Sequence, residues 1–541
     1  MQAPVTLDWK RRFWIGATFG LAVFCGSLMS APAIAATQGG TLVIITVPEP
    51  TTLTNALTSA STVTEVGTKI FDGLLEYDMS MKPLPSLAQS WTVSPDGKTV
   101  TFKLRPNVTW HDGKPFTSAD VQYSLMEIVK KLHPRGPGNL GPVTAIETPD
   151  PLTAVFKLER PYPPMLKGLS SAEAPILPRH LYEGTDLRNN PNNIKPIGTG
   201  PFMFSAWDRG SAITLVKNPK YWKSRRPYLD RLIFRFVADS GTRSAVMESQ
   251  EAQVATFGTI VPAEMQRLSK LPQLEIAKGG YEALAPILSL ELNNKKAPLD
   301  NVKVRQAIAY VIDRKFIADN IFYGYGKPAI GPISSVYASS GIYTDAGVQR
   351  YDTADRLKKA AALLDEAGLP LKNGVRFTLT HDVGPYGEDY RRLGEYLRQA
   401  LGQVGIRVTL RNEDWGAWLK RIYTDYDYDF TSGWFVGMGD PNLGVQRIYL
   451  TSNIKSGIGF ANATRYSDPE VDQMWAAAAN ELDLAKRNET FHALQRKLSV
   501  DSPLIWLLEL DMVALQNKKV KDLITSPLGM RASLAETSLD K

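Results

Sequence analysis

Cysteine is almost absent from this sequence. Among 541 residues there is one, Cys25, and it lies close to the N-terminus. The rest of the chain therefore cannot form a disulfide framework, and its stability must come from a large buried core. Histidine is also scarce, with five residues at positions 111, 133, 180, 381 and 492. No two of them have metal-ligand spacing, so we expect no directly bound metal.

Signature motifs of common enzymes are missing as well. The sequence contains no G-x-S-x-G, no H-E-x-x-H and no Walker sequence. The glycine-rich stretch GMGDPNLG at 437–444 lacks the G-x-G-x-x-G spacing of dinucleotide sites. We therefore expect no catalytic residues and no cofactor. The competing hypothesis, a secreted hydrolase, would be distinguished by turnover of a peptide or ester.

Long hydrophobic runs are confined to the N-terminus. Three basic residues at 10–12 precede a mostly apolar stretch at 13–29, and small residues at Ala33 and Ala35 fit an A-x-A cleavage site. Residues 1–35 are predicted to be an export signal peptide, cleaved near Ala35. The alternative is a membrane anchor, for which the apolar run is short. We favour the general secretory route over the twin-arginine route that the paired arginines suggest.

Beyond the three basic residues at 10–12, charge of one sign is not concentrated in runs. The formal net charge is +7. Removing Asp8, Lys10, Arg11 and Arg12 with the signal peptide takes away +2, which leaves +5. The remaining basic residues are scattered and form no runs. This distribution argues against nucleic acid as a partner.

The length exceeds what one hydrophobic core supports, so two or three domains are expected. The first half mixes strands and helices, with a hairpin that turns at Asp96-Gly97. From about Leu288 the pattern becomes strand, helix, strand, helix, strand, which predicts a largely parallel α/β sheet. The run at 504–515 would return the chain to the first lobe. The predicted division is a first lobe at 36–287 with a subdomain around 80–195, a second lobe at 288–505, and a return segment at 506–541.

Local signals place several elements of the second lobe. An apolar stripe from Val304 to Ile317 predicts a helix that Asp300 caps. A second helix is predicted to begin with Thr353 as its cap and to end at Gly368. Alternating apolar residues predict two strands, one over 406–410 and one over Tyr426, Tyr428 and Phe430.

Candidate ligand-binding residues follow predicted strands. In open α/β sheets, ligands bind beyond the carboxyl ends of the strands. Loops at 380–387 and 433–442 lie there in the second lobe, and a loop at 47–53 lies there in the first, which predicts an aromatic pocket. The candidates are Glu49, Thr51, Tyr386, Trp434, Phe435, Met438 and Asp440. Two of them have structural alternatives, because Trp434 could belong to the core and Asp440 could cap a Gly-Asp-Pro turn.

The stretch WHDGKPFTSADVQYSL at 110–125 admits two interpretations. His111 and Ser118 would be the polar groups of an acid–base site. Alternatively, Thr117 and Asp120 form a capping box that begins a helix. Ser118 then lies in the first helical turn with His111 on the far side of the preceding turn, so a nucleophile–base pair needs unfavourable geometry. We predict the structural role.

A longer stretch around it, LAQSWTVSPDGKTVTFKLRPNVTWHDGKPFTSADVQYSL at 87–125, resembles the signature of the extracytoplasmic solute-binding proteins of the peptide/nickel class, family 5, which serve ABC importers. Further segments agree in the family's order. They are PIGTGPFMFSAW at 196–207, NPKYW at 218–222, LDNVKVRQAIAYVIDR at 299–314, LLDEAG at 363–368 and YSDPEVDQMWAAA at 466–478. The resemblance spans nearly all of the predicted mature chain.

The resemblance implies an α/β fold, namely a two-lobed periplasmic binding protein of type II, cluster C, with an extra subdomain in the first lobe and two crossing hinge segments. It also implies a periplasmic monomer that closes its lobes on a small-molecule or short peptide ligand. The closed form would dock on ABC permease subunits in the inner membrane, whose ATPases supply the energy. No chemistry is expected of the binding protein itself.

The resemblance leaves the ligand open. Peptide-binding relatives carry an acidic residue shortly after the tryptophan equivalent to Trp434, and it pairs with the α-amine of the ligand. Here that region holds Gly437, and the nearest acid is Asp440. A peptide or peptide-like solute is the main hypothesis. The alternatives are a modified amino acid, a sugar conjugate or a chelated metal, and a chaperone or signalling role is also left open.

Overall fold

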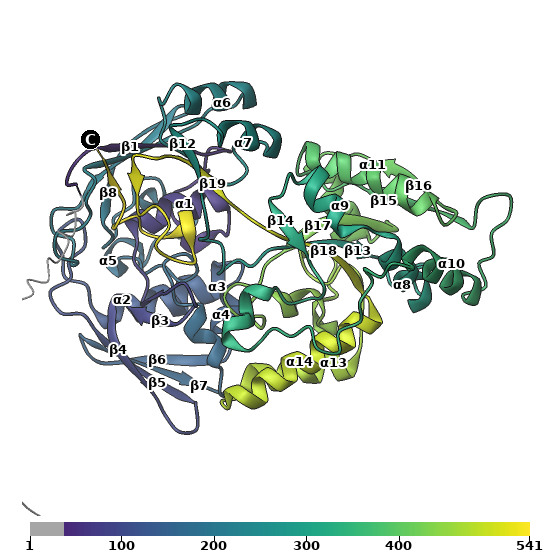
Figure 1. Cartoon of the computed structure of the whole chain (residues 1–541). Coiled ribbons are helices and arrows are strands. Elements are labelled where there is room, and N and C mark those ends of the chain that lie inside the picture. The colour runs from purple at the N-terminus through teal and green to yellow at the C-terminus, as the bar shows by residue number, and fades with distance from the viewer. Residues whose placement is uncertain (1–36, 541) are drawn as a thin grey trace, which may run out of the picture. The chain divides into compact units, whose positions relative to one another are not determined.

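The computed structural model describes residues 37–540, so the predicted signal peptide at 1–35 lies outside the described residues. The first lobe is built on a seven-stranded mixed sheet in the order β12-β19-β11-β1-β10-β9-β8 (Figure 1). The central strand β1 pairs in parallel with β10 and β11, and the outer ladders are antiparallel. The strands are β1 (Thr41–Ile45), β8 (Phe202–Asp208), β9 (Ala212–Lys217), β10 (Arg231–Arg235), β11 (Val254–Ala255), β12 (Leu274–Ala277) and β19 (Ala514–Asn517).

A separate four-stranded antiparallel sheet, in the order β4-β5-β7-β6, occupies the region of the predicted subdomain. Its strands are β4 (Ala88–Val93), β5 (Thr99–Leu104), β6 (Val143–Asp150) and β7 (Thr153–Leu158). The predicted hairpin is confirmed, because β4 and β5 pair across a turn in which Gly97 has a φ of +66°. Two short pairs, β2 (Leu75–Tyr77) with β3 (Pro83–Pro85) and β20 (Val520–Lys521) with β21 (Ser538–Leu539), complete the strands of this lobe.

The helices of the first lobe are short. They are α1 (Ser61–Ile70), α2 (Ser118–Tyr123), α3 (Lys130–Leu132), α4 (Gly136–Leu140), α5 (Arg179–Tyr182), α6 (Ser240–Glu248) and α7 (Pro262–Leu268). The capping box predicted for α2 is confirmed, since the Thr117 backbone N–H donates to Asp120 Oδ2 at 2.9 Å. Ser118 Oγ donates to the Asp150 carbonyl, and the ring of His111 bonds the Gly200 carbonyl and the Gly198 N–H. These polar residues therefore serve the local fold.

The second lobe carries a six-stranded sheet in the order β14-β18-β13-β17-β15-β16. Its strands are β13 (Ile287–Leu292), β14 (Gly326–Pro328), β15 (Phe377–Asp382), β16 (Ile406–Arg411), β17 (Phe430–Phe435) and β18 (Leu504–Leu510). Its helices are α8 (Val302–Val311), α9 (Arg314–Phe316), α10 (Arg356–Glu366), α11 (Glu388–Gly402), α12 (Trp415–Leu419), α13 (Pro469–Asn480) and α14 (Leu484–Asp501), the last two lying in contact (Figure 1).

Several expectations for the second lobe were wrong in detail. The sheet is mixed, because β13 pairs antiparallel with both β17 and β18, and only the ladders of β15 are parallel. Strand β17 starts at Phe430, since Tyr426 has a φ of +54° and ends the preceding helical turn. The cap of α8 is Asn301, whose side chain accepts from the Lys303 N–H, and not Asp300. Helix α10 starts after Asp355, and not at Thr353.

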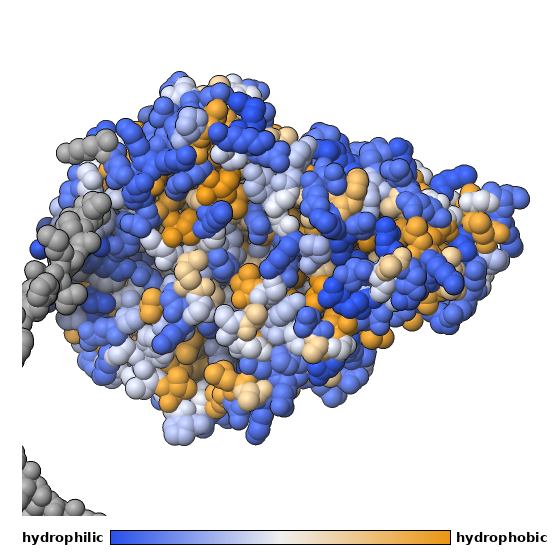
Figure 2. Space-filling view, in the orientation of Figure 1, coloured by the Kyte–Doolittle hydropathy of each residue, from blue (hydrophilic) through white to orange (hydrophobic). Residues whose placement is uncertain are grey.

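The chain passes between the two large sheets twice, over residues 278–286 and 511–513. The exact lobe boundaries at 287/288 and 505/506 stay a prediction. Within residues 37–540, none of the helices combines the length and hydropathy that crossing a membrane requires. Figure 2 shows hydrophobic residues as separate patches within a largely hydrophilic face.

Candidate functional site

A cavity of about 350 Å³ is lined by residues of both lobes, and we call it the interlobe cavity. The first lobe contributes the start of α1 at 59–61 together with Arg135 and Arg531. The second lobe contributes most of the remaining wall, including the end of β17. This volume lies in the range of pockets that hold small organic ligands. Another cavity, of about 450 Å³, lies at the crossing segments, and its aromatic lining residues are Tyr281 and Tyr325.

Aromatic side chains form one wall of the interlobe cavity. Tyr386 packs edge-on against Trp415, with ring centroids 5.3 Å apart, and lies 6.5 Å from Trp434. Phe460 extends the wall, with its ring 6.2 Å from Trp415 and 5.4 Å from Tyr423. Trp415 is 43 % exposed and Phe460 is 40 % exposed, so part of this wall is open to solvent. Such a surface suits the apolar body of a ligand.

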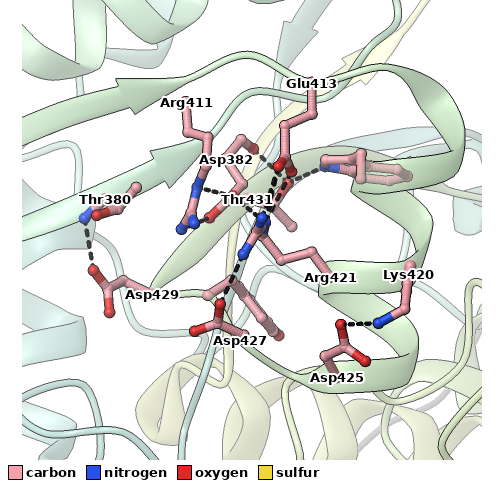
Figure 3. Close-up of polar contacts among 12 residues, drawn as sticks. Thr380, Asp382, Arg411, Glu413, Lys420, Arg421, Asp425, Asp427, Asp429 and Thr431 are labelled. Carbon is pink, nitrogen blue, oxygen red and sulfur yellow. Dashed lines mark hydrogen bonds and ion pairs between the residues drawn. The ribbon is translucent and has the colours of Figure 1, made fainter.

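An ion-pair cluster joins the carboxyl ends of β15 and β16 to the segment that follows α12 (Figure 3). Asp382, at the carboxyl end of β15, pairs with Arg411 of β16 at 2.7 Å. Arg421 lies between Glu413 and Asp427 and pairs with them at 2.8 and 2.7 Å, which ties the turn after α12 to its neighbours. These charges are paired with one another, so the cluster has a structural role.

Glu291 of β13 supplies the one carboxyl group among the residues that line the interlobe cavity. It is 8 % exposed, and its side chain accepts a hydrogen bond from Tyr423 Oη at 3.1 Å. Burial raises the pKa of Glu291 to about 7, and the bond from Tyr423 opposes this shift. Within residues 37–540, no cation lies within ion-pair distance of it. A Cβ at the facing Gly433 would lie 3.3 Å from Glu291 Oε1, so the glycine leaves room for the carboxyl group.

Three arginines line the same cavity. Arg135 is paired with Glu173 through two bonds of 2.6 Å. Arg531 donates to Ser61 Oγ at 2.7 Å, and Arg447 donates to the Gly459 carbonyl at 2.7 Å. For both Arg447 and Arg531, burial lowers the pKa, and the positive charge of Arg135 lowers it further. The guanidinium groups therefore repel one another in a partly desolvated space, which favours a bound anion.

The structure places four of the seven predicted site residues around this cavity. Tyr386, Trp434, Phe435 and Met438 line it, and Trp434 packs against the hydrophobic cores of both lobes. Trp434 and Phe435 are residues of β17 itself, and not of a loop beyond it. Sequence reasoning missed the three arginines and Glu291. A lone acid in the buried strand ILSLEL was the available signal for Glu291.

The other three candidates lie outside the lining. Glu49 accepts bonds from Trp207 Nε1 at 2.9 Å and from the Gly210 N–H at 3.1 Å. Thr51 is exposed. Asp440 is 2 % exposed, pairs with Arg487 at 2.7 Å and accepts from the Asn442 N–H.

Gly437, in the segment after Trp434 where the resemblance led us to expect an acid, has no room for a side chain. A Cβ there would lie 2.2 Å from Tyr337 Oη. Tyr337 is buried, so an acid at 437 would need Tyr337 to move. The carboxyl group among the lining residues therefore comes from β13 and not from the segment after Trp434.

The part of the chain that the structure describes contains no preformed metal site. Residues 37–540 contain no group of three or more His, Cys, Asp or Glu side chains placed to hold an ion. His381 is buried against Phe430, with stacked rings 4.7 Å apart, and burial lowers its pKa to about 3.

A family model, two curated relatives and a solved structure all match this chain to bacterial solute-binding proteins. Residues 82–456 match the family model described as bacterial extracellular solute-binding proteins, family 5 Middle. The chain is 30 % identical to the glutathione-binding protein GsiB of Pectobacterium atrosepticum, over 85 % of this chain and 87 % of that protein. It is 27 % identical to the dipeptide-binding protein of Escherichia coli, over 93 % and 95 %. The structure of AgaA from A. tumefaciens R10, in complex with agropinic acid, is similar with a TM-score of 0.76 and 27 % identity, over 93 % and 99 %.

Proposed function

Because this chain belongs to family 5 of the bacterial extracellular solute-binding proteins, we propose that it captures a peptide or peptide-like solute in the interlobe cavity and delivers it to a membrane permease. The observation that carries this proposal is a cavity of ligand size whose wall comes from both lobes. A solute that contacts both walls favours the closed arrangement, because only that arrangement makes both sets of contacts. Ligand binding and lobe closure are then one event.

The proposed contacts follow from the lining. Trp415, Tyr386 and Trp434 hold the apolar body of the solute, and Phe435 and Met438 complete that wall. Glu291 receives the amine of the solute, since it is the lining carboxyl group and no cation among the described residues pairs with it. One or more of the three arginines receive the carboxylate. Glu49, Thr51 and Asp440 are left out of this contact set.

The wider setting is part of the same proposal. The chain is exported by a signal peptide cleaved near Ala35 and works in the periplasm as a monomer. Its partners are ABC permease subunits in the inner membrane with their ATPases, and it performs no reaction on its solute. The names of the relatives support peptide-like solutes, glutathione and dipeptides among them. The agropinic acid complex of AgaA supports a modified amino acid as the second candidate.

Two measurements on the purified chain from Ala36 onward test the function. The first is mass spectrometry of small molecules released on denaturation. The second is the Tm in the presence of dipeptides, glutathione or agropinic acid, because a ligand that binds only the folded chain raises Tm. We expect a Tm rise with at least one peptide-like compound and no product. A chain that releases nothing and responds to none of these compounds, or one that hydrolyses them, contradicts the proposal.

A further inference from the structure

The charges around the interlobe cavity do not balance. Arg135 is neutralised by Glu173, which it contacts through two nitrogens. Glu65 and Lys69, one turn apart on α1, are both buried and add one charge of each sign, and Glu65 attracts Arg531 as well as Lys69. The charges that remain in this count are the two positive charges of Arg447 and Arg531 and the negative charge of Glu291. The surplus is therefore at least one positive charge.

Neither surplus guanidinium forms an ion pair among the described residues, and the carboxylates of Glu173 and Glu65 act on Arg531 only from beyond ion-pair distance. Among residues 37–540, no carboxylate lies within ion-pair distance of Arg447 or Arg531. Their closest polar partners are the neutral Gly459 carbonyl and the Ser61 hydroxyl. Arg531 is only 7 % exposed, so water compensates little of its charge. Desolvated, unpaired guanidinium groups are costly to keep, and pairing them with an anion relieves the cost.

The start of α1 adds to the positive character of this wall. Residues 59–61 line the cavity beside Arg531. The N-cap residue Ala60 offers no side-chain acceptor, and the first turn of α1 contains no acid. The first backbone N–H groups of the helix and its dipole therefore add partial positive charge where the guanidinium of Arg531 lies.

An ordinary dipeptide does not satisfy this set. Its ammonium pairs with Glu291 and its single carboxylate pairs with one guanidinium, which leaves the other guanidinium without a partner. A solute with one ammonium and two acid groups pairs with all three residues. We propose that the physiological solute is such an acidic peptide-like compound, with a net charge of −1, whose two carboxylates are held by Arg447 and Arg531 and whose amine is held by Glu291. This inference rests on the proposed function and narrows its substrate class.

The test compares two dipeptides of nearly equal shape, Ala-Glu and Ala-Gln, by isothermal titration calorimetry. We expect Ala-Glu to bind at least about tenfold more tightly, equivalent to about 1.4 kcal/mol. We expect Ala-Lys to bind more weakly than either. Because the extra attraction is electrostatic and only partly buried, the preference for Ala-Glu is expected to shrink as the salt concentration rises.

Arg447→Gln is the informative variant, because Arg447 is half-buried in the 3-10 helix Val445–Ile448 and its guanidinium donates to the Gly459 carbonyl rather than to a charged group. It is expected to weaken Ala-Glu at least about tenfold. The matched control is Arg188→Gln. Arg188 is exposed, lies outside the cavity lining, and has no side-chain partner among residues 37–540. We expect this control to change the affinity less than about twofold. Equal affinities for Ala-Glu and Ala-Gln, or an unchanged affinity in Arg447→Gln, overturn the inference and leave the proposed function standing.

If the wild-type chain binds none of these dipeptides, the compound released on denaturation and identified by mass spectrometry tests the inference. A non-peptide compound with two acid groups sustains the inference and removes the peptide part of the proposed function. A neutral or cationic compound overturns the inference alone. A chain that binds no probe and releases nothing contradicts both.

Discussion

Two buried carboxyl groups of the second lobe, Asp440 and Glu291, have opposite surroundings. Asp440 is paired with Arg487 at 2.7 Å and also accepts from the Asn442 N–H. Among residues 37–540, the side chain of Glu291 has one hydrogen-bond partner, the hydroxyl of Tyr423, and it faces the interlobe cavity. The comparison teaches that burial alone does not mark a ligand contact. A buried carboxylate with its own cation stabilises the fold, and one without a cation is available to a ligand.

The largest expected effect concerns the paired group. Asp440→Asn leaves the buried guanidinium of Arg487 without its counter-ion, so we expect the free energy of unfolding to fall by about 3 kcal/mol. Chemical denaturation measures it. The double variant Asp440→Asn with Arg487→Gln is expected to recover part of the loss, since it removes the orphaned charge. A loss below about 0.5 kcal/mol would show that Asp440 does not anchor this segment.

Glu291→Gln should act mainly through pH. Burial raises the pKa of Glu291 to about 7 from an ordinary value of 4.5, so the folded chain keeps a proton that the unfolded chain releases. This contribution to stability is present below pH 4.5 and is lost as the pH rises to 7, by up to about 3 kcal/mol. The variant has no proton to lose. The stability difference between variant and wild type, measured from pH 4 to 8, is therefore expected to shift in favour of the variant, and a flat difference contradicts the raised pKa.

A smaller effect is expected on the aromatic wall. Trp415→Ala removes a ring that contacts Tyr386 and lines the cavity, so the Kd of the solute should rise roughly fivefold, or about 1 kcal/mol. The matched control is Phe316→Ala, because Phe316 is equally exposed and stacks on Tyr396 away from the cavity. Equal effects of the two substitutions on Kd would mean that the wall does not touch the solute.

The smallest effect is expected at Thr51. The side chain is exposed and lies outside the cavity lining, so Thr51→Ala should change both stability and Kd by less than about 0.5 kcal/mol. Denaturation and calorimetry on the same sample measure both quantities. A clear loss of affinity without loss of stability would return Thr51 to the contact set.

The order of elements could be predicted from the sequence, because hydrophobic periodicity and turn residues report local structure. The capping box at Thr117 and the turn at Gly97 are of this kind. The direction of β13 could not be predicted from the sequence. Its antiparallel pairing with β17 and β18 joins segments far apart in the chain, and no local pattern encodes it. The choice between Asp300 and Asn301 as cap depends on one residue of register, which periodicity leaves undetermined.

For the site, the aromatic half was easier to predict than the charged half. Trp434 and Tyr386 stand near strand ends, where ligands of such sheets bind. Arg135 precedes α4, and Arg447 and Arg531 lie in two short 3-10 helices. The three residues are far apart in the sequence, and only the fold brings them together. Glu291 lies inside a strand, and Asp440 was the more visible acid because it stands in a glycine-rich turn.

The most direct test of the account compares Ala-Glu with N-acetyl-Ala-Glu on wild type and on Glu291→Gln. Acetylation removes the amine that Glu291 is proposed to receive, so it should weaken binding to wild type at least about tenfold. In Glu291→Gln the same modification should cost little, because the charged partner is already gone. An equal loss in both proteins would mean that the amine binds elsewhere, and that Glu291 is not the ligand's acid.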